Sequence, residues 1–259
     1  MTSPVWNNAV RAPVSSIQAR VELAAVCRLI ASEGFAPIGG ARLAARDPER
    51  AGVYFVNPGG MLLDEIHASA LIEVDADGNR CDSGRGEPDS GALELVLAAL
   101  EARPEAAAAA QVATTAGTVV AALREGLLPI TQTAFLFVGA IGSMNWDPDA
   151  SRQGVRGSIA HALGTDARAV LVRGRGLLVC AETLAHTWKL LFFLNKCCQS
   201  QIEAMAVANA TGRQLKTPSE GVIDHAVAQS RSFVAHPRFI ADWPSYLDQL
   251  DSEDASFRE

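Results

Sequence analysis

Histidine and cysteine side chains are the residues of this sequence that could hold a metal ion or act as nucleophiles. The five histidines share no short spacing: His67, His161, His186, His225 and His236. Zinc needs three or four such side chains converging on one point. The five cysteines also lack ligand spacing, and no Ser–His–Asp or Cys–His arrangement can be inferred from the pattern. The sequence therefore predicts no metal site and no cysteine or serine nucleophile.

A turn and a strand end supply the polar candidates for ligand binding. The segment Asn57-Pro58-Gly59-Gly60 predicts a chain reversal whose backbone amides could hold an anion. Thr114 and Thr115 would place hydroxyl groups on a pocket wall, although threonine is also a common strand residue. The pair Gly174-x-Gly176 lacks the strand-to-helix context of a dinucleotide site. All three lysines lie in the C-terminal part of the chain, so an imine-forming lysine is not expected.

Hydrophobic periodicity and turn signals predict alternating helices and strands. The expected helices cover residues 15–33, 91–102, 116–124, 151–163, 183–208 and 219–234. The expected strands cover residues 53–56, 72–74, 107–114, 134–141, 169–173 and 176–180. A hairpin signal at Asp77-Gly78 favours a mixed or antiparallel sheet over a parallel one. We expect a layered α/β/α fold with a mixed, mainly antiparallel central sheet and a long C-terminal helix.

Length and charge limit the possible organisation and partners. The 259 residues suit one α/β domain with a helical extension, and we expect an N-terminal arm at 1–14, the domain at 15–212, and a helical extension with an acidic tail at 213–259. A net charge of -7 argues against a nucleic-acid partner. The apolar stretches are interrupted by charges, and the first residues lack the apolar core of a signal peptide. A cytoplasmic protein with reduced thiols and no membrane partner is expected.

Four stretches, taken in order, resemble the class II aldolase/adducin family. They are the helix at 20–30 with the segment at 44–48, the turn at 57–66 with its continuation at 74–79, the segment at 128–132, and the segment at 169–183 with the helix after it. The end at 243–257 also resembles bacterial adducin-like members. The resemblance covers nearly the whole chain and implies the class II aldolase-like version of the layered fold.

The resemblance implies a zinc site that this chain lacks. In the family, a His-x-His pair on one strand and an Asn-His-Gly turn bind zinc, which stabilises an enediolate while a glutamate moves the proton. Here the pair aligns with Val112 and Thr114, the turn is Gly174-Arg175-Gly176, and the glutamate aligns with Gly91. We therefore expect no zinc-dependent aldol cleavage. No cofactor of another kind is expected either.

Two arginines align with positions that face the substrate in the family. Arg42 aligns with the turn that holds the substrate phosphate, and Arg175 aligns with the zinc-binding turn. Arg173 lies two residues before Arg175 and would face the same substrate only if the strand is regular. A guanidinium group is always charged and binds carboxylates or phosphates through paired donors. The alternative is that Arg175 fills the space of the metal and pairs with a local carboxylate. The candidates for that partner are Asp64, Glu65 and Asp89.

Two functions follow from these expectations. In the first, a metal-independent pocket binds or transforms a small anionic or carbonyl-containing molecule, by lyase-type carbon–carbon chemistry or isomerisation. Arg175 and Arg42 would then stabilise negative charge, and Glu65 would be the base. By neighbourhood alone, Asp64, Asp89 and Glu182 are equal candidates for that base. In the second, the chain is a non-catalytic member that acts through assembly or ligand sensing. The resemblance implies a homotetramer with the site at the subunit boundary.

Overall fold

A seven-stranded sheet forms the centre of the molecule. The computed structural model describes residues 13–35, 40–84, 88 and 90–259. The strands lie in the order β3-β2-β1-β4-β7-β6-β5, and only β5 and β6 pair in parallel. Their bounds are Ala41–Arg46 (β1), Tyr54–Val56 (β2), Ile72–Val74 (β3), Ala108–Val112 (β4), Ile141–Asn145 (β5), Ala169–Arg173 (β6) and Gly176–Ala181 (β7). The predicted mixed, mainly antiparallel sheet is confirmed.

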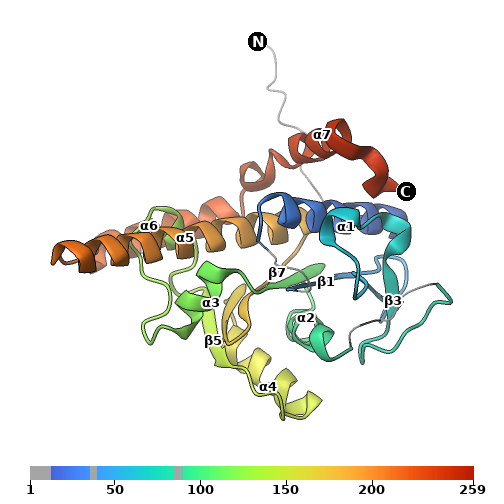
Figure 1. The fold of residues 1–259 in the computed structure, drawn as a ribbon, viewed down its shortest axis with the longest axis horizontal. Coiled ribbons are helices and arrows are strands. Elements are labelled where there is room, and N and C mark those ends of the chain that lie inside the picture. The colour runs from blue at the N-terminus through green and yellow to red at the C-terminus, as the bar shows by residue number, and fades with distance from the viewer. Residues whose placement is uncertain (1–12, 36–39, 85–87, 89) are drawn as a thin grey trace.

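Helices cover both faces of this sheet (Figure 1). One apolar cluster contains side chains of α1, α3 and α5, and the other contains side chains of α2 and α4. Successive strand residues alternate between the two clusters, as Leu43 and Ala44 of β1 do. The helix bounds are Ser16–Ser32 (α1), Ser90–Ala102 (α2), Thr115–Ala122 (α3), Arg152–Leu163 (α4) and Leu184–Thr211 (α5). The layered α/β/α arrangement is therefore as predicted.

The long helix α5 begins and ends at residues that suit helix termini. The Thr183 hydroxyl accepts a hydrogen bond from the His186 amide at 3.0 Å, and Gly212 ends the helix with a φ of +66°. Charged residues interrupt its apolar surface. Among the helices of the described residues, none is long and apolar enough to cross a membrane.

The chain after α5 returns to the first layer. Helices α6 (Glu220–Val234) and α7 (Trp243–Asp254) follow, and Phe239, Trp243 and Phe257 join the cluster around α1 and α5. Arg28 of α1 forms an ion pair with Asp254 at 2.6 Å. Residues 213–259 thus share a core with the preceding part, and the boundary at residue 212 stays a prediction. Most of the expected N-terminal arm lies outside the described residues.

Three elements differ from the sequence-based expectation. Strand β1 was not predicted, because its sequence Ala-Arg-Leu-Ala-Ala-Arg has neither alternation nor β-branched residues. The strand predicted at 134–141 is wrong, since a 3-10 helix at Thr133–Leu136 and Gly139 at a φ of +68° occupy this segment. The strand begins only at Ile141. Helix α7 extends into the segment expected to be an acidic tail, and Trp243 and Leu250 are buried in it.

Candidate functional site

One end of the sheet brings together residues that are far apart in the sequence. Antiparallel pairing places Ala41 beside Val112, and Val112 beside Leu177. The start of β1, the end of β4 and the start of β7 therefore meet there. The parallel pair of Asn145 and Arg173 adds the ends of β5 and β6. The two arginines predicted to act together, on β1 and on the turn between β6 and β7, both belong to this end.

Gln111 links the strands on the face covered by α2 and α4. It is the cross-strand neighbour of Arg42, and both lie on this face by alternation. The Gln111 side-chain nitrogen Nε2 donates a hydrogen bond to the Arg175 carbonyl oxygen at 2.5 Å. Arg42 is buried, and its Nη1 donates to the Ala41 carbonyl at 2.7 Å. Gln111 thus lies beside Arg42 in the sheet and also bonds to the backbone of Arg175.

Arg175 lies in a tight turn between two glycines of positive φ. Gly174 has a φ of +83° and Gly176 a φ of +92°, and the Arg175 guanidinium carbon lies 4.9 Å from the centroid of the Trp146 ring. This stacking orients the cation without neutralising it. Arg173 points toward Asn145, with 3.5 Å between Nη1 and Oδ1, which is at most a weak hydrogen bond.

Neither Arg173 nor Arg175 forms an ion pair with a carboxylate of the described residues. The alternative in which Arg175 pairs with Asp64 or Glu65 is therefore not supported. Asp89, the third carboxylate considered for that pairing, lies outside the described residues. An arginine that is partly buried, oriented and not neutralised can accept an anion from solution.

The residues present do not fit a zinc ion. Val112 is fully buried in the cluster of α1, α3 and α5, and the Thr114 hydroxyl accepts from the Gly117 amide at 2.8 Å to cap α3. By strand alternation Gln111 lies on the opposite face of β4 from Val112, and Ala113, directly after the strand, lies close to Gly176. An amide, a methyl group and the guanidinium of Arg175 are not zinc ligands. Within the described ranges, no group of three or more His, Cys, Asp or Glu could hold a metal ion.

The turn at 57–60 is fixed to the first strand by Asn57. This residue is buried, its Oδ1 accepts from the Leu43 amide at 2.8 Å, and its Nδ2 donates to the Ala41 carbonyl at 3.3 Å. The side chain is thereby used by the fold rather than offered to a ligand. Gly59 and Gly60, with Gly60 at a φ of +78°, are held near the start of β1, where their backbone amides stay candidates for anion contact.

The structure places three other candidates in different parts of the fold. Glu65 is exposed, and its Oε2 accepts from the Leu62 amide at 3.3 Å within a short helix that packs on α1. The structure therefore places Glu65 with the layer opposite the face of Arg42. Glu182 lies beyond the other end of β7, where it forms an ion pair with Arg168 at 3.0 Å. Thr115 is exposed at the start of α3, and its hydroxyl stays a candidate contact.

Sequence reasoning missed two residues that shape this site, Gln111 and Trp146. A signal for Gln111 was available, because it is the polar residue of a strand in which the other four residues are apolar and buried. Buried polar residues are the informative exceptions in a core. Trp146 directly follows β5, a strand that was predicted seven residues too early, so its position could not be inferred.

Known proteins resemble the chain over most of its length. The model of the Class II Aldolase and Adducin N-terminal domain matches residues 21–202. A protein of Caulobacter vibrioides whose name places it among the class 2 aldolases is 27% identical over 242 residues, which cover 93% of this chain and 92% of that protein. Beta-adducin of Rattus norvegicus is 25% identical over 210 residues, which are 80% of this chain and 29% of that protein.

Solved structures agree with this match. An aldolase II superfamily protein from Pseudomonas syringae has a TM-score of 0.87 and 28% identity, with 96% of this chain and 98% of that chain covered. An L-fuculose 1-phosphate aldolase from Glaciozyma antarctica shares the fold with a TM-score of 0.78 at 24% identity, covering 94% and 93%. On the extent of the family match and the shared architecture, the chain belongs to the class II aldolase and adducin family.

Proposed function

We propose that the sheet end is a metal-independent site that binds a small anionic or carbonyl-containing molecule through Arg175. The observation that carries this proposal is the state of the Arg175 side chain. The guanidinium group stacks on Trp146 and has no carboxylate partner among the described residues, and the backbone carbonyl of Arg175 accepts a hydrogen bond from Gln111. A guanidinium group offers five donors in a fixed plane, and a ligand carboxylate matches two of them.

Neighbouring groups extend the proposed site. Arg42 adds a second positive charge from β1, and Arg173 adds a third from the end of β6. The amides of Gly59 and Gly60 and the hydroxyl of Thr115 are proposed as further ligand contacts. Asn57 and Thr114 act indirectly, because their side chains fix the turn and the start of α3.

As the reaction at this site we propose lyase-type carbon–carbon chemistry or isomerisation. Positive charge at the sheet end would stabilise the negative charge that develops on a carbonyl oxygen. Such chemistry also needs a base. No carboxylate of the described residues contacts Arg173 or Arg175, and Glu65 lies in the layer of α1. This shortage favours the second candidate function, a non-catalytic member that acts by ligand sensing or assembly.

We further propose a cytoplasmic homotetramer built from the family domain at 15–212 and the helical extension at 213–259. The family match begins at residue 21, close to the proposed start of the domain at residue 15, which supports that boundary. The net charge of -7 supports the absence of a nucleic-acid partner. Sedimentation velocity at several concentrations tests the oligomeric state, and a monomer at all concentrations would contradict it.

Titration calorimetry with pyruvate tests the ligand proposal, with uncharged methyl pyruvate as the comparison ligand. Arg175→Gln should weaken pyruvate binding about 10-fold or more, since a charged hydrogen bond contributes about 1.5–3 kcal/mol. Arg124→Gln is the matched control, because Arg124 is exposed after α3 and forms no ion pair with the described residues. Equal pyruvate affinity in the two variants would contradict the assignment. Absence of pyruvate binding to the unmodified protein would favour the assembly role.

A further inference from the structure

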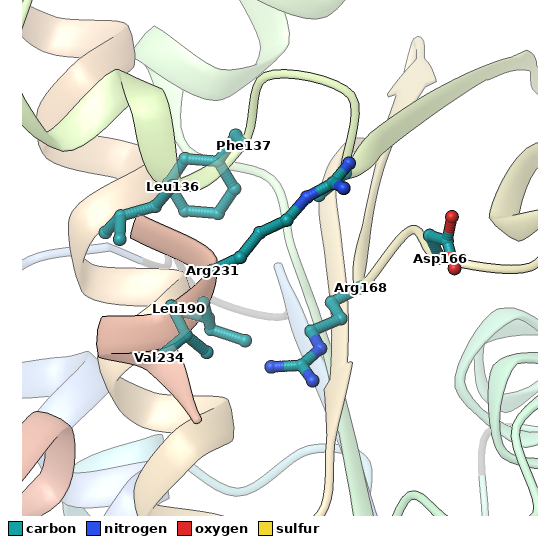
Figure 2. A pocket seen from close by; sticks show the side chains of 8 residues that line it. Leu136, Phe137, Asp166, Arg168, Leu190, Arg231 and Val234 are labelled. Atoms are coloured by element: carbon teal, nitrogen blue, oxygen red, sulfur yellow. The ribbon is translucent and has the colours of Figure 1, made fainter. Parts of the chain in front are cut away.

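A separate cavity lies at the other end of the sheet (Figure 2). It has a volume of about 250 Å³ and lies between α5, α6, the loop before β5 and the start of β6. Its lining residues are Leu136, Phe137, Ala140, Asp166, Arg168, Leu190, Arg231 and Val234. Arg168 precedes β6 and Arg173 ends it, so the length of that strand, about 16 Å, separates this cavity from the site of Arg175.

The inner wall of the cavity is apolar. Phe137, Leu190 and Val234 are buried and come from three different segments of the chain. A cavity of about 150 Å³ lined by such side chains holds one benzene molecule. A volume of about 250 Å³ therefore suits an aromatic ring, or a branched aliphatic group, that carries one further substituent of a few atoms.

The outer wall carries a cation that the described residues do not neutralise. Arg168 is paired with Glu182 at 3.0 Å, whereas Arg231 makes no ion pair and no side-chain hydrogen bond with the described residues. In Figure 2 the Arg231 side chain extends over the cavity toward the loop that follows Phe137. Asp166 is exposed and lies beyond Arg168, on the side away from Leu190 and Val234. An apolar pocket with one available guanidinium group at its mouth matches an amphipathic anion.

We propose that this cavity binds a small aromatic or branched aliphatic monocarboxylate, with the carboxylate on Arg231 and the apolar part against Phe137, Leu190 and Val234. Arg231 and Val234 belong to α6, while the other two belong to the body of the domain. Val234 is the one buried residue of α6. The ligand therefore bridges α6 to the domain and stabilises its packing.

Titration calorimetry with benzoate tests this site, with benzamide as an uncharged ligand of the same shape. Benzoate should bind the unmodified protein more tightly than benzamide does, and Arg231→Gln should weaken benzoate binding about 10-fold or more. Arg213→Gln is the matched control, because Arg213 is exposed after α5 and makes no ion pair with the described residues. Equal benzoate affinity in these two variants would overturn the proposal.

A cavity-filling variant separates this site from the one at Arg175. Ala140→Phe should abolish benzoate binding, because the added ring occupies the cavity, while Arg175→Gln should leave it unchanged. Hydrogen exchange of the α6 amides should slow when benzoate is added to the unmodified protein. Failure of the unmodified protein to bind benzoate, or loss of binding in Arg175→Gln instead of Ala140→Phe, would overturn the second site. Neither of these two outcomes decides the pyruvate test of Arg175, because that test measures a different ligand at a different site.

Discussion

The hairpin that carries Arg175 depends on Gly176 for two separate reasons, and substitution by alanine tests both. Its φ of +92° is a conformation that costs a residue with a side chain about 1–2 kcal/mol. An added Cβ would also lie 2.4 Å from the Val112 carbonyl oxygen, which belongs to the backbone of the adjacent strand. Forced movement of packed groups costs a further 1–3 kcal/mol or so. Gly176→Ala should therefore lower the free energy of unfolding by about 2–5 kcal/mol.

Gly174→Ala is the control that isolates the backbone strain from the steric contact with Val112. Gly174 has a φ of +83°, and an added Cβ there meets nothing within 4 Å. Only the strain of about 1–2 kcal/mol is expected at this position. Equilibrium urea unfolding of both variants, at one protein concentration, measures the two losses. Equal losses would show that β7 does not approach β4 as closely as the structure indicates, and would refute the reasoning.

Three other predictions concern polar groups that the fold uses. Burial raises the pKa of Glu22 to about 7, against 4.5 for an exposed glutamate, so Glu22→Gln should stabilise the protein by up to about 3 kcal/mol at pH 8.5 in urea unfolding. At pH 4 the carboxyl is protonated in the folded state and mostly protonated in the unfolded state, so little effect is expected there. Thr114→Val should lower the free energy of unfolding by about 1 kcal/mol, because the hydroxyl that caps α3 is lost, whereas Thr115→Val should change it little. Similar losses in the two variants, measured by urea unfolding, would contradict the capping role of Thr114. Burial lowers the pKa of His186 below 6.5, so the stability that the neutral imidazole contributes is present above pH 6.5 and is lost as the pH falls. The free energy of unfolding should therefore fall less between pH 7.5 and 5.5 in a His186→Gln variant, and an equal fall in both proteins would contradict this assignment.

The sequence predicted the layers of the fold better than the positions of individual strands. Helices α1, α2 and α5 follow clear apolar periodicity and have recognisable termini, such as Ser15 and Thr183. The alanine-rich strands were harder, because alanine favours neither pattern strongly. Strand β4 was predicted because Pro104 separates it from α2, whereas β1 had no such signal. The segment at 134–141 illustrates the limit, since Phe137 is buried there without being in a strand.

The sequence indicated where the candidate site residues lie better than it indicated what their side chains contact. Arg42 and Arg175 lie at the same end of the sheet, as the resemblance implied. Which side chains face that end depends on strand register, and Val112 packs in the cluster of α1, α3 and α5 instead. Whether a polar group is available depends on its hydrogen bonds, which sequence does not show. Asn57 and Thr114 are examples, since both bond to the backbone.

The central claim is that this member of the family works without a metal ion. Elemental mass spectrometry of the purified, tag-free protein, together with a zinc titration, tests it most directly. The side chains of Gln111, Ala113 and Arg175 offer zinc no ligand, so we predict neither stoichiometric metal nor zinc binding at micromolar concentration. One zinc ion per chain, lost when histidines are substituted, would contradict the account and place the metal site elsewhere in the molecule.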